Sequence, residues 1–337
     1  MKLTRIFVPL VASMVLYSCA SNNLSYEGKA FKNAYASIKA EELKKNLSVI
    51  ASDEMQGRDT GSEGQKKAGK YMIDFYKNIG VSYPKVLGSY YQTVPKEALK
   101  SRGKELPESE NILAFIEGTE KPEEIIVVSA HYDHVGTKDG VVYNGADDDG
   151  SGTVAVMEIA EAFQQAKKAG KGPKRSILFL HVTGEEHGLL GSKYYADHPV
   201  YDMKNTVVDL NIDMIGRSDK ENEGKNYVYV IGSEMLSSEL KVINEAANKI
   251  THNLELNYKY DDPKDPMRLY YRSDHYNFAK SGVPVAFYFD GIHADYHQPT
   301  DDVDKIDFPL LQKRAQLVFA TAWELANRKD RIVVDKK

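Results

Sequence analysis

The chain has 337 residues, a formal net charge of −5 and a hydrophobic fraction of 42%. This length suffices for one large α/β domain or two small ones, and the hydrophobic fraction is ordinary for a globular protein. The slightly acidic charge and the even spread of the lysines argue against a nucleic acid as partner. Beyond the N-terminus, no apolar run is long enough to cross a membrane.

The first residues have the pattern of an export signal. Lys2 and Arg5 precede an apolar segment at residues 6–16, which predicts a signal peptide over residues 1–18. The only cysteine, Cys19, follows in a context that resembles the lipobox of bacterial lipoproteins. The resemblance implies a lipid on Cys19 that anchors the exported protein to a membrane, as a periplasmic or cell-surface lipoprotein of a bacterial envelope. An ordinary cleaved signal with an incidental cysteine is the alternative.

The remaining chain is predicted to form one domain. Residues 20–29 are polar, and residues 19–35 are predicted to form the lipidated N-terminus and a tether. The catalytic domain is expected over residues 36–330, with a short tail at residues 331–337. The sequence has neither an internal repeat nor a low-complexity block, so nothing divides this domain further.

Strand and helix patterns alternate along the domain. Amphipathic spacing predicts helices over residues 37–51, 62–79, 151–168, 237–250 and 307–326. Apolar runs predict strands at residues 90–94, 111–117, 125–130, 176–182, 206–212, 227–231 and 283–289. Residues 96–110 are expected to form a loop, and residues 255–272 an excursion from the sheet. This alternation predicts an α/β fold with a single mixed, mostly parallel sheet covered by helices on both faces.

Histidines and carboxylates follow several of these strands directly. In open α/β sheets, ligands bind just beyond the carboxyl ends of the strands. Each such residue alone is weak evidence, because single histidines and acidic turns are common. Together they predict a metal site built from His131, Asp133, the Asp147–Asp149 run, Glu185, Glu186, Asp213 and His297.

The residue types narrow the choice of metal. Imidazoles with carboxylates and no thiolate suit zinc or another borderline divalent ion. Calcium would not call for histidines. Two histidines and at least three carboxylates exceed the need of one tetrahedral ion, whereas two ions that share a bridging carboxylate would use them all.

Several motifs together resemble the co-catalytic di-zinc aminopeptidases of metallopeptidase clan MH. The resemblance covers most of the chain beyond the tether and implies the zinc-exopeptidase (aminopeptidase/phosphorylase-like) architecture. A protease-associated domain is not expected, because the segment at residues 85–106 is too short for one. The motifs are Ala130-His131-Tyr132-Asp133, Gly145 to Gly152, Gly184-Glu185-Glu186, Asn211 to Gly216, Tyr296-His297 and, near the start, Gly57 to Gly61.

The resemblance assigns a role to each site residue. His131 and Asp213 would hold one zinc ion, Glu186 and His297 would hold the other, and Asp148 would bridge the two. Glu185 would be the general base, and Asp133 would orient His131. Tyr296 would stabilise the oxyanion. Two Zn²⁺ ions per chain are therefore expected.

The same roles agree with the chemistry of peptide hydrolysis. A zinc ion lowers the pKa of bound water to about 7, and a neighbouring glutamate can take the water proton and pass it to the leaving amine. The resemblance implies an exopeptidase that removes the N-terminal residue from peptides. Negative charge from Asp133, Asp301 and Asp302 near an almost neutral ligand shell would favour a substrate ammonium group.

Three alternatives remain open from the sequence. A carboxypeptidase or dipeptidase of the same clan could use Arg268 or Arg272 to bind a terminal carboxylate. Glutaminyl cyclases share the fold, but they bind one zinc ion and lack part of this ligand set. A non-enzymatic lipoprotein that binds metal or sugar would not require the base Glu185.

The other histidines near the motifs are assigned no metal. His134, His187 and His293 adjoin motifs, but the resemblance leaves no ligand position for them. His181, within a strand, is predicted to be structural. His275 could be structural or face the substrate.

Overall fold

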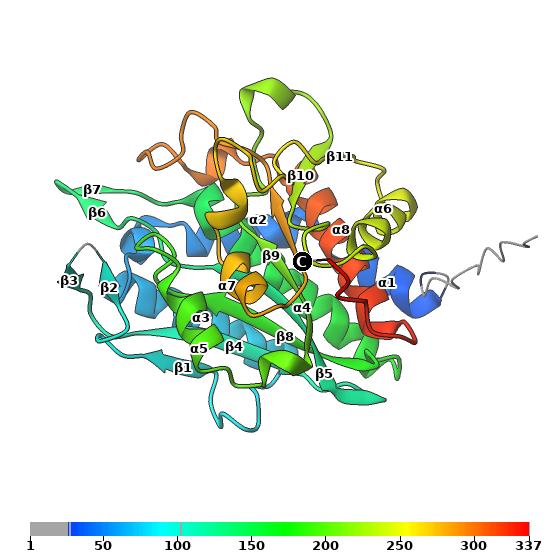
Figure 1. Cartoon of the computed structure of the whole chain (residues 1–337). Coiled ribbons are helices and arrows are strands. Elements are labelled where there is room, and N and C mark those ends of the chain that lie inside the picture. The colour runs from blue at the N-terminus through cyan, green and yellow to red at the C-terminus, as the bar shows by residue number, and fades with distance from the viewer. Residues whose placement is uncertain (1–25, 27, 102, 337) are drawn as a thin grey trace, which may run out of the picture.

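The computed structural model describes residue 26 and residues 28–101 and 103–336 (Figure 1). The predicted signal peptide and Cys19 lie outside these residues. Residues 20–25 and 27 of the predicted tether lie outside them as well.

One sheet of eight strands runs through the molecule in the order β1-β4-β8-β5-β9-β12-β10-β11 (Figure 1). In this order the strands are Tyr91–Val94, Ser109–Ile116, Arg175–Val182, Lys121–His131, Thr206–Ile212, Val285–Phe289, Tyr227–Ile231 and Glu255–Asn257. The central strands β8, β5, β9 and β12 are parallel to their neighbours in this group. The pairs β1–β4, β4–β8 and β10–β12 are antiparallel, and β10–β11 is parallel. The predicted mixed, mostly parallel sheet is confirmed.

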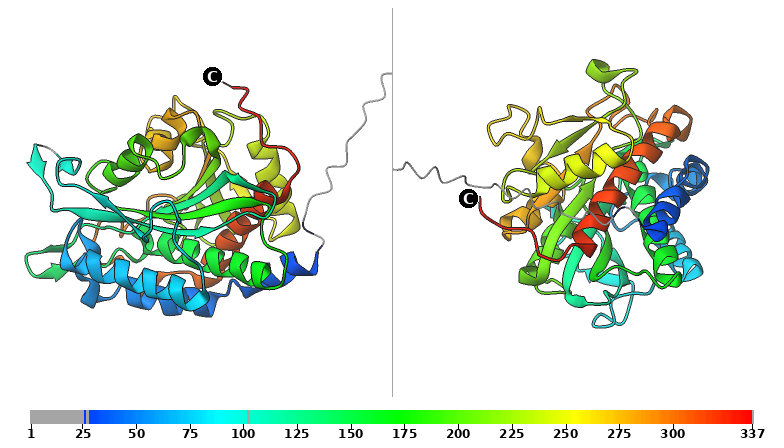
Figure 2. Two further views of the ribbon diagram at one scale, coloured as in Figure 1. Left: turned by 90° about the horizontal axis from the view of Figure 1, so that it is seen from below. Right: turned by 90° about the vertical axis from the view of Figure 1, so that its right-hand side faces the viewer.

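Helices cover both faces of this sheet. The larger layer holds α1 (Lys29–Ser37), α2 (Ala40–Ile50), α3 (Glu63–Ile79), α4 (Gly152–Lys168), α6 (Leu240–Ile250) and α8 (Phe308–Asn327). The opposite face carries the short helices α5 (Leu190–Asp197) and α7 (His275–Lys280), as the left view of Figure 2 shows.

The central strand β5 shows why the sheet needs two layers. Ile126 and Val128 belong to the apolar core under the larger helix layer, whereas Ile125 and Val127 belong to the core under α5 and α7. Successive side chains of a strand point to opposite faces, so a continuous apolar run must be covered on both.

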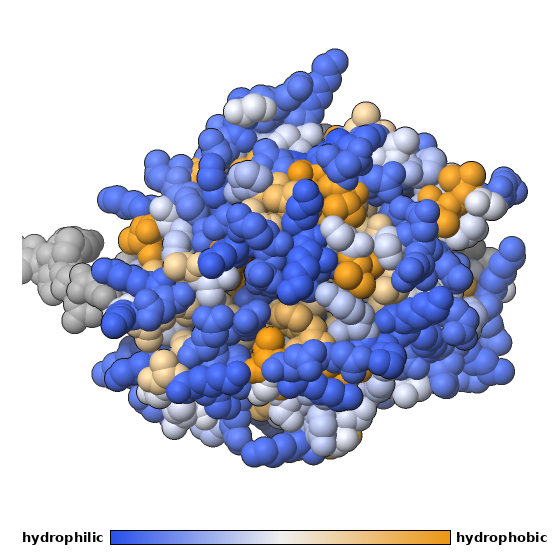
Figure 3. Space-filling model, turned by 180° about the vertical axis from the view of Figure 1, so that it is seen from behind, coloured by the Kyte–Doolittle hydropathy of each residue, from blue (hydrophilic) through white to orange (hydrophobic). Residues whose placement is uncertain are grey.

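The outer surface of the molecule is mostly polar. The face seen in Figure 3 is largely hydrophilic, with apolar residues in small separate groups. Within the described part of the chain, no helix is long and apolar enough to span a membrane.

Helix α3 begins and ends where the sequence predicts. The Ser62 side chain accepts a hydrogen bond from the backbone N–H of Gln65 at 3.2 Å and caps the first turn. Gly80 ends the helix at a φ of 81°, a conformation that glycine adopts without steric cost.

The structure differs from the prediction in its short elements and at its ends. The tether was predicted to reach residue 35, but residues from Lys29 onward form helix α1, because Phe31 and Ala34 are buried against the core. In the predicted tail, Ile332 is buried as well. The predicted excursion contributes the edge strand β11 to the sheet.

Short hairpins and turns complete the chain. The hairpins are β2 with β3 (Lys100–Ser101, Lys104–Glu105) and β6 with β7 (Thr137–Lys138, Val141–Val142). The short helical segments are η2 (Asp53–Arg58), η3 (Ala146–Ser151), η4 (Met203–Asn205), η5 (Lys220–Asn222), η6 (Leu269–Tyr271) and η7 (Val303–Lys305).

Candidate metal centre

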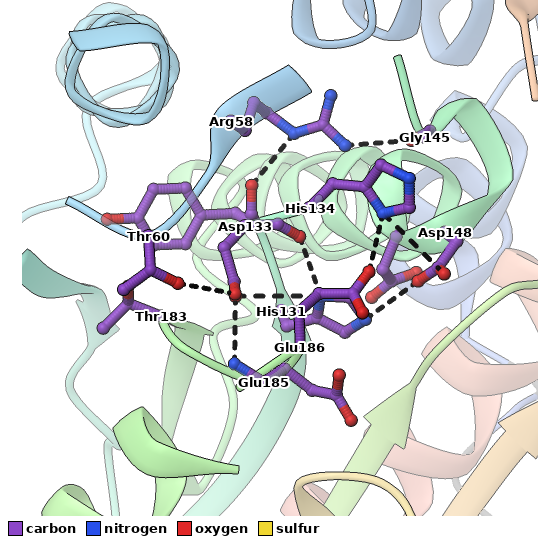
Figure 4. Close-up of polar contacts among 12 residues, drawn as sticks. Arg58, Thr60, His131, Asp133, His134, Gly145, Asp148, Thr183, Glu185 and Glu186 are labelled. Atoms are coloured by element: carbon purple, nitrogen blue, oxygen red, sulfur yellow. Dashed lines mark hydrogen bonds and ion pairs between the residues drawn. The ribbon is translucent and has the colours of Figure 1, made fainter. Parts of the chain in front are cut away.

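The predicted site residues meet at one edge of the sheet. His131 is the last residue of β5, Asp213 directly follows β9, and the two glutamates lie just after β8. Because these strands are parallel, their carboxyl ends lie side by side. Figure 4 shows His131, Asp148 and Glu186 turned toward one another at this edge.

Three buried residues form what we call the first cluster: His131, Asp148 and Asp213. Nε2 of His131 lies 3.3 Å from Oδ1 of Asp148 and 3.5 Å from Oδ1 of Asp213. The other oxygen of Asp213 accepts a hydrogen bond of 2.7 Å from the Ser273 hydroxyl. The carboxylate of Asp213 is therefore held in place by Ser273.

The second cluster consists of Asp148, Glu186 and His297. Nε2 of His297 lies 3.1 Å from Oδ2 of Asp148 and 2.9 Å from Oε2 of Glu186. His297 has a positive φ of 57°, and its side chain is 36% exposed. Asp148 thus presents one oxygen to each cluster, as a bridging carboxylate does.

The donor atoms fit divalent metal ions. Ligand bonds of about 2.0–2.1 Å at tetrahedral angles place two donor atoms about 3.3 Å apart, and the four distances within the clusters lie close to this value. Nε2 of His131 is buried and makes no hydrogen bond among the described residues, although two carboxylates adjoin it. Imidazole nitrogen with carboxylate oxygen is a zinc-type donor set.

A buried arginine holds the loop that carries Asp148. The guanidinium of Arg58 donates hydrogen bonds to the backbone carbonyls of Tyr132, Ile50, Asn144 and Gly145 at 2.7–2.9 Å. These bonds join three segments: the end of α2, the residues after β5 and the residues that lead into η3. Figure 4 shows the bond to Gly145. They give the Gly57-Arg58 motif a structural role that the sequence alone did not reveal.

Asp301 holds the same loop from the other side. Its carboxylate accepts hydrogen bonds from the backbone N–H groups of Asp147 and Asp148 at 3.1–3.2 Å. The sequence suggested only that Asp301 adds negative charge near the site. Asp301 instead positions the backbone of the bridging aspartate.

Asp133 adjoins His131 mainly through its backbone carbonyl. Nδ1 of His131 lies 3.0 Å from the backbone carbonyl of Asp133 and 3.8 Å from its carboxylate. The carboxylate instead accepts hydrogen bonds from the Thr60 hydroxyl at 3.0 Å and the Glu185 backbone N–H at 3.2 Å. Asp133 therefore links the position of His131 to that of Glu185.

Glu185 and Tyr296 face an open cleft beside the second cluster. The cleft has a volume of about 570 Å³, and its lining includes both residues together with Glu186 and His297. Removal from water raises the pKa of the Glu185 carboxyl well above its usual range. Burial also raises the pKa of the Tyr296 hydroxyl, so this phenol keeps its proton at neutral pH.

A smaller pocket adjoins this cleft, and its lining includes Asp148 and Asp213 of the first cluster. Glu185, Arg272 and Tyr296 line both spaces. The apolar lining is formed by Met214, Leu269, Phe287, Phe289 and Ile292.

The two arginines considered for carboxylate binding differ in position. Arg272 lines the cleft that contains Glu185. The guanidinium of Arg268 lies over the ring of Tyr271, 4.8 Å from its centroid, and Arg268 is not among the described residues that line the cleft. Only Arg272 is therefore placed beside Glu185.

Most of the remaining histidines have other partners. His187 pairs with Asp59 at 3.0 Å and His293 with Asp147 at 3.1 Å. His181 contacts the Tyr76 hydroxyl at 2.6 Å, and burial lowers its pKa to about 3. His275 is buried and stacks on Phe287 at 4.7 Å, so it packs against the core.

His134 is the exception. Sequence reasoning left it without a metal, but its Nδ1 lies 2.7 Å from Oε1 of Glu186, at the second cluster. Its position directly after Asp133 gave no signal for this contact, because the contact depends on how the loop turns after β5.

The fold and the cluster define an α/β protein with a candidate metal centre at the carboxyl edge of its sheet. The sequence pattern of Peptidase family M28 matches residues 111–322, and the chain belongs to this family.

Named relatives agree with this assignment. The chain is 29% identical to aminopeptidase YwaD of Bacillus subtilis over 261 residues, which cover 73% of the chain and 51% of the relative. It is 31% identical to a probable leucine aminopeptidase of Arthroderma otae over 222 residues, which cover 64% of the chain and 57% of the relative. The chain thus spans little more than half the length of these relatives.

Solved structures share the fold. The LapA aminopeptidase of Legionella pneumophila superposes with a TM-score of 0.70 at 18% identity, covering 97% of this chain and 81% of that one. A zinc aminopeptidase from Bacillus subtilis gives 0.65 at 17% identity, covering 88% and 98%. The glutaminyl cyclase of Porphyromonas gingivalis gives 0.65 at 19% identity, covering 84% and 97%. At such identities the likeness establishes the fold alone.

Proposed function

We propose that the chain is a metal-dependent aminopeptidase that removes the N-terminal residue from peptides. The proposed metals are two zinc ions, held by His131, Asp148 and Asp213 and by Asp148, Glu186 and His297. The observation that carries the proposal is the placement of Glu185 and Tyr296, which line both the cleft beside Glu186 and His297 and the smaller pocket beside Asp148 and Asp213. A pure metal-binding protein would have no need of a base at this position.

The residues of the cleft fit the steps of hydrolysis. Bound zinc ions would supply Lewis acidity and a water molecule of lowered pKa. Glu185, whose pKa is raised, would accept the proton of the attacking water and return it to the leaving amine. The neutral hydroxyl of Tyr296 would donate a hydrogen bond to the oxyanion. Asp133 would keep Glu185 in place through the backbone N–H of that residue.

Three forms of one short peptide test which end of the substrate is recognised. The first has both termini free, the second is N-acetylated and the third is amidated at its C-terminus. Hydrolysis that stops on acetylation and survives amidation supports an aminopeptidase. The reverse pattern overturns the proposal.

A carboxypeptidase or dipeptidase is the second candidate, and Arg272 is the reason to keep it. This arginine lines the same cleft as Glu185, so it could bind the terminal carboxylate of a short substrate. The amidated peptide would then be the poor substrate, and Arg272→Ala would remove the preference for a free carboxylate.

We also propose that the protein is exported and anchored to a membrane by a lipid on Cys19. The support is the basic start, the apolar run and the position of the only cysteine. One acyl chain gives only marginal binding, so a stable anchor needs more than one. Cys19→Ala should therefore move the protein from the membrane fraction to the soluble one. A wild-type protein that is already soluble after export contradicts the lipid.

A further inference from the structure

We infer that His134 is an additional ligand of the second cluster and binds the same metal ion as Glu186 and His297 through its Nδ1. This inference rests on the proposed metal centre and extends it. The second cluster would then offer two imidazoles and two carboxylates, whereas the first cluster offers one imidazole and two carboxylates.

The position of the imidazole is the first argument. His134 is fully buried, and its Nδ1 lies 2.7 Å from Oε1 of Glu186 and 3.7 Å from Oδ2 of Asp148. Donor atoms of these three residues lie within 4.8 Å of one another. Figure 4 shows the ring turned toward both carboxylates.

The missing hydrogen bond is the second argument. Nδ1 of His134 is buried at ion-pair distance from two carboxylates, but neither contact has the alignment of a hydrogen bond. Nε2 of His131, in the first cluster, is in the same situation. By contrast, the ring nitrogens of His187 and His293 that adjoin aspartates do form hydrogen bonds with them. Nitrogen and carboxylate oxygens that converge on one point without an aligned hydrogen bond supply the kind of donor set that holds a zinc ion.

The surroundings of the ring hold it in this orientation. A side-chain carbon at Gly145 would lie 2.5 Å from two ring atoms of His134, so the loop backbone packs directly on the ring. The backbone N–H of His134 donates to the carbonyl of Arg58 at 3.2 Å, and Arg58 in turn binds the carbonyl of Gly145. Nε2 of His134 makes no hydrogen bond within the described part of the chain, so no such bond explains why the ring points at the cluster.

Ligation has a consequence for metal preference. Imidazole donors favour zinc and its borderline neighbours over magnesium or manganese, which prefer oxygen. The second cluster should therefore discriminate for zinc more strongly than the first, and His134→Ala should reduce this difference.

The test is a competition titration of the metal-free full chain with zinc, for the wild type and for two variants. The zinc-binding step that His297→Ala weakens is assigned to the second cluster. The amide nitrogen of His134→Asn can reach the place of Nδ1 and donate a hydrogen bond to Glu186, but it cannot bind a metal ion. His134→Ala has neither ability. Both variants should weaken the marked step by more than the roughly 10–100-fold that loss of an outer-sphere partner costs, and leave the other step unchanged.

X-ray absorption gives an independent readout. The zinc-loaded wild type should show three imidazoles for two ions, and His134→Asn should show two. His187→Asn is the matched control, because that histidine is near the cluster but binds Asp59, and it should leave both steps and the imidazole count unchanged.

Each other outcome overturns the inference. A His134→Asn variant with near-normal affinity would make His134 a hydrogen-bond donor to Glu186. Equal weakening of both steps would indicate a role in folding. A wild type that binds two ions through only two imidazoles would exclude ligation and leave the metal centre intact, whereas a wild type that binds no zinc would overturn both proposals.

Discussion

Apart from the shared Asp148, the residues of the first cluster lie at the ends of two buried strands, whereas the residues of the second cluster lie on loops. His131 ends β5 and Asp213 follows β9, and both are buried. Glu186 lies in the turn between β8 and α5, and His297 lies in a loop beyond β12 with a third of its side chain exposed.

The first cluster is also supported by residues of the sheet, whereas the contact of His297 described below is made within its own loop. Behind Asp213, the Ser273 hydroxyl accepts a hydrogen bond from Asn211 at 2.9 Å, and Asn211 accepts one from Ser129 at 2.9 Å. This buried chain of polar groups reaches back into the sheet. The ring of His297 stacks on Tyr296 at 4.0 Å, on the same loop. The first cluster is therefore fixed by the fold, and the second depends on loops that must be held separately.

The largest effect is expected where the two clusters join. Asp148 gives one oxygen to each, so Asp148→Ala should lower the affinity of both zinc ions and reduce hydrolysis to background. Metal analysis after dialysis measures this change. If the variant retained two ions, Asp148 would not be the bridge and the clusters would be independent.

The next effect concerns the base that serves both clusters. Glu185→Gln should reduce kcat by about 10²–10⁴-fold, because the amide cannot accept the water proton. Its metal content should stay at the wild-type level. The neighbouring variant Glu186→Gln is the control, because it should lose metal at the second cluster. Glu185 has no part in the reaction if its variant keeps most of the wild-type kcat.

A smaller effect should distinguish the clusters. Ser273→Ala removes the hydroxyl that holds Asp213, and loss of such a partner typically costs about 10–100-fold in metal affinity. Only the step that belongs to the first cluster should weaken. Ser281→Ala, whose hydroxyl bonds to the backbone carbonyl of Asn277, is the matched control. Equal weakening of both steps would mean that the two clusters share their support.

The long buried strands could be predicted from the sequence, whereas several short elements could not. Long apolar runs, such as those of β5 and β8, identify buried parallel strands and thereby the edge where the site lies. Short elements gave too little pattern. Helix α7 has six residues and strand β11 has three, and their conformation depends on contacts with the sheet.

In the site, too, the residues at strand ends were predictable, and contacts between distant segments were not. His131 and Asp213 lie directly at strand ends, whereas His297 follows its strand at a distance, and its role as a ligand of one particular ion came only from the resemblance to a family. The hydrogen bonds of Arg58 and Ser273 and the contact of His134 join residues far apart in the sequence, or depend on the turn of a loop. No local pattern records such contacts.

A competition titration of the metal-free chain with zinc tests the two-cluster centre most directly. We predict that the wild type binds two ions per chain, that Asp213→Ala weakens one of the two steps, and that His297→Ala weakens the other. Binding of a single ion, or weakening of the same step by both variants, would contradict the account.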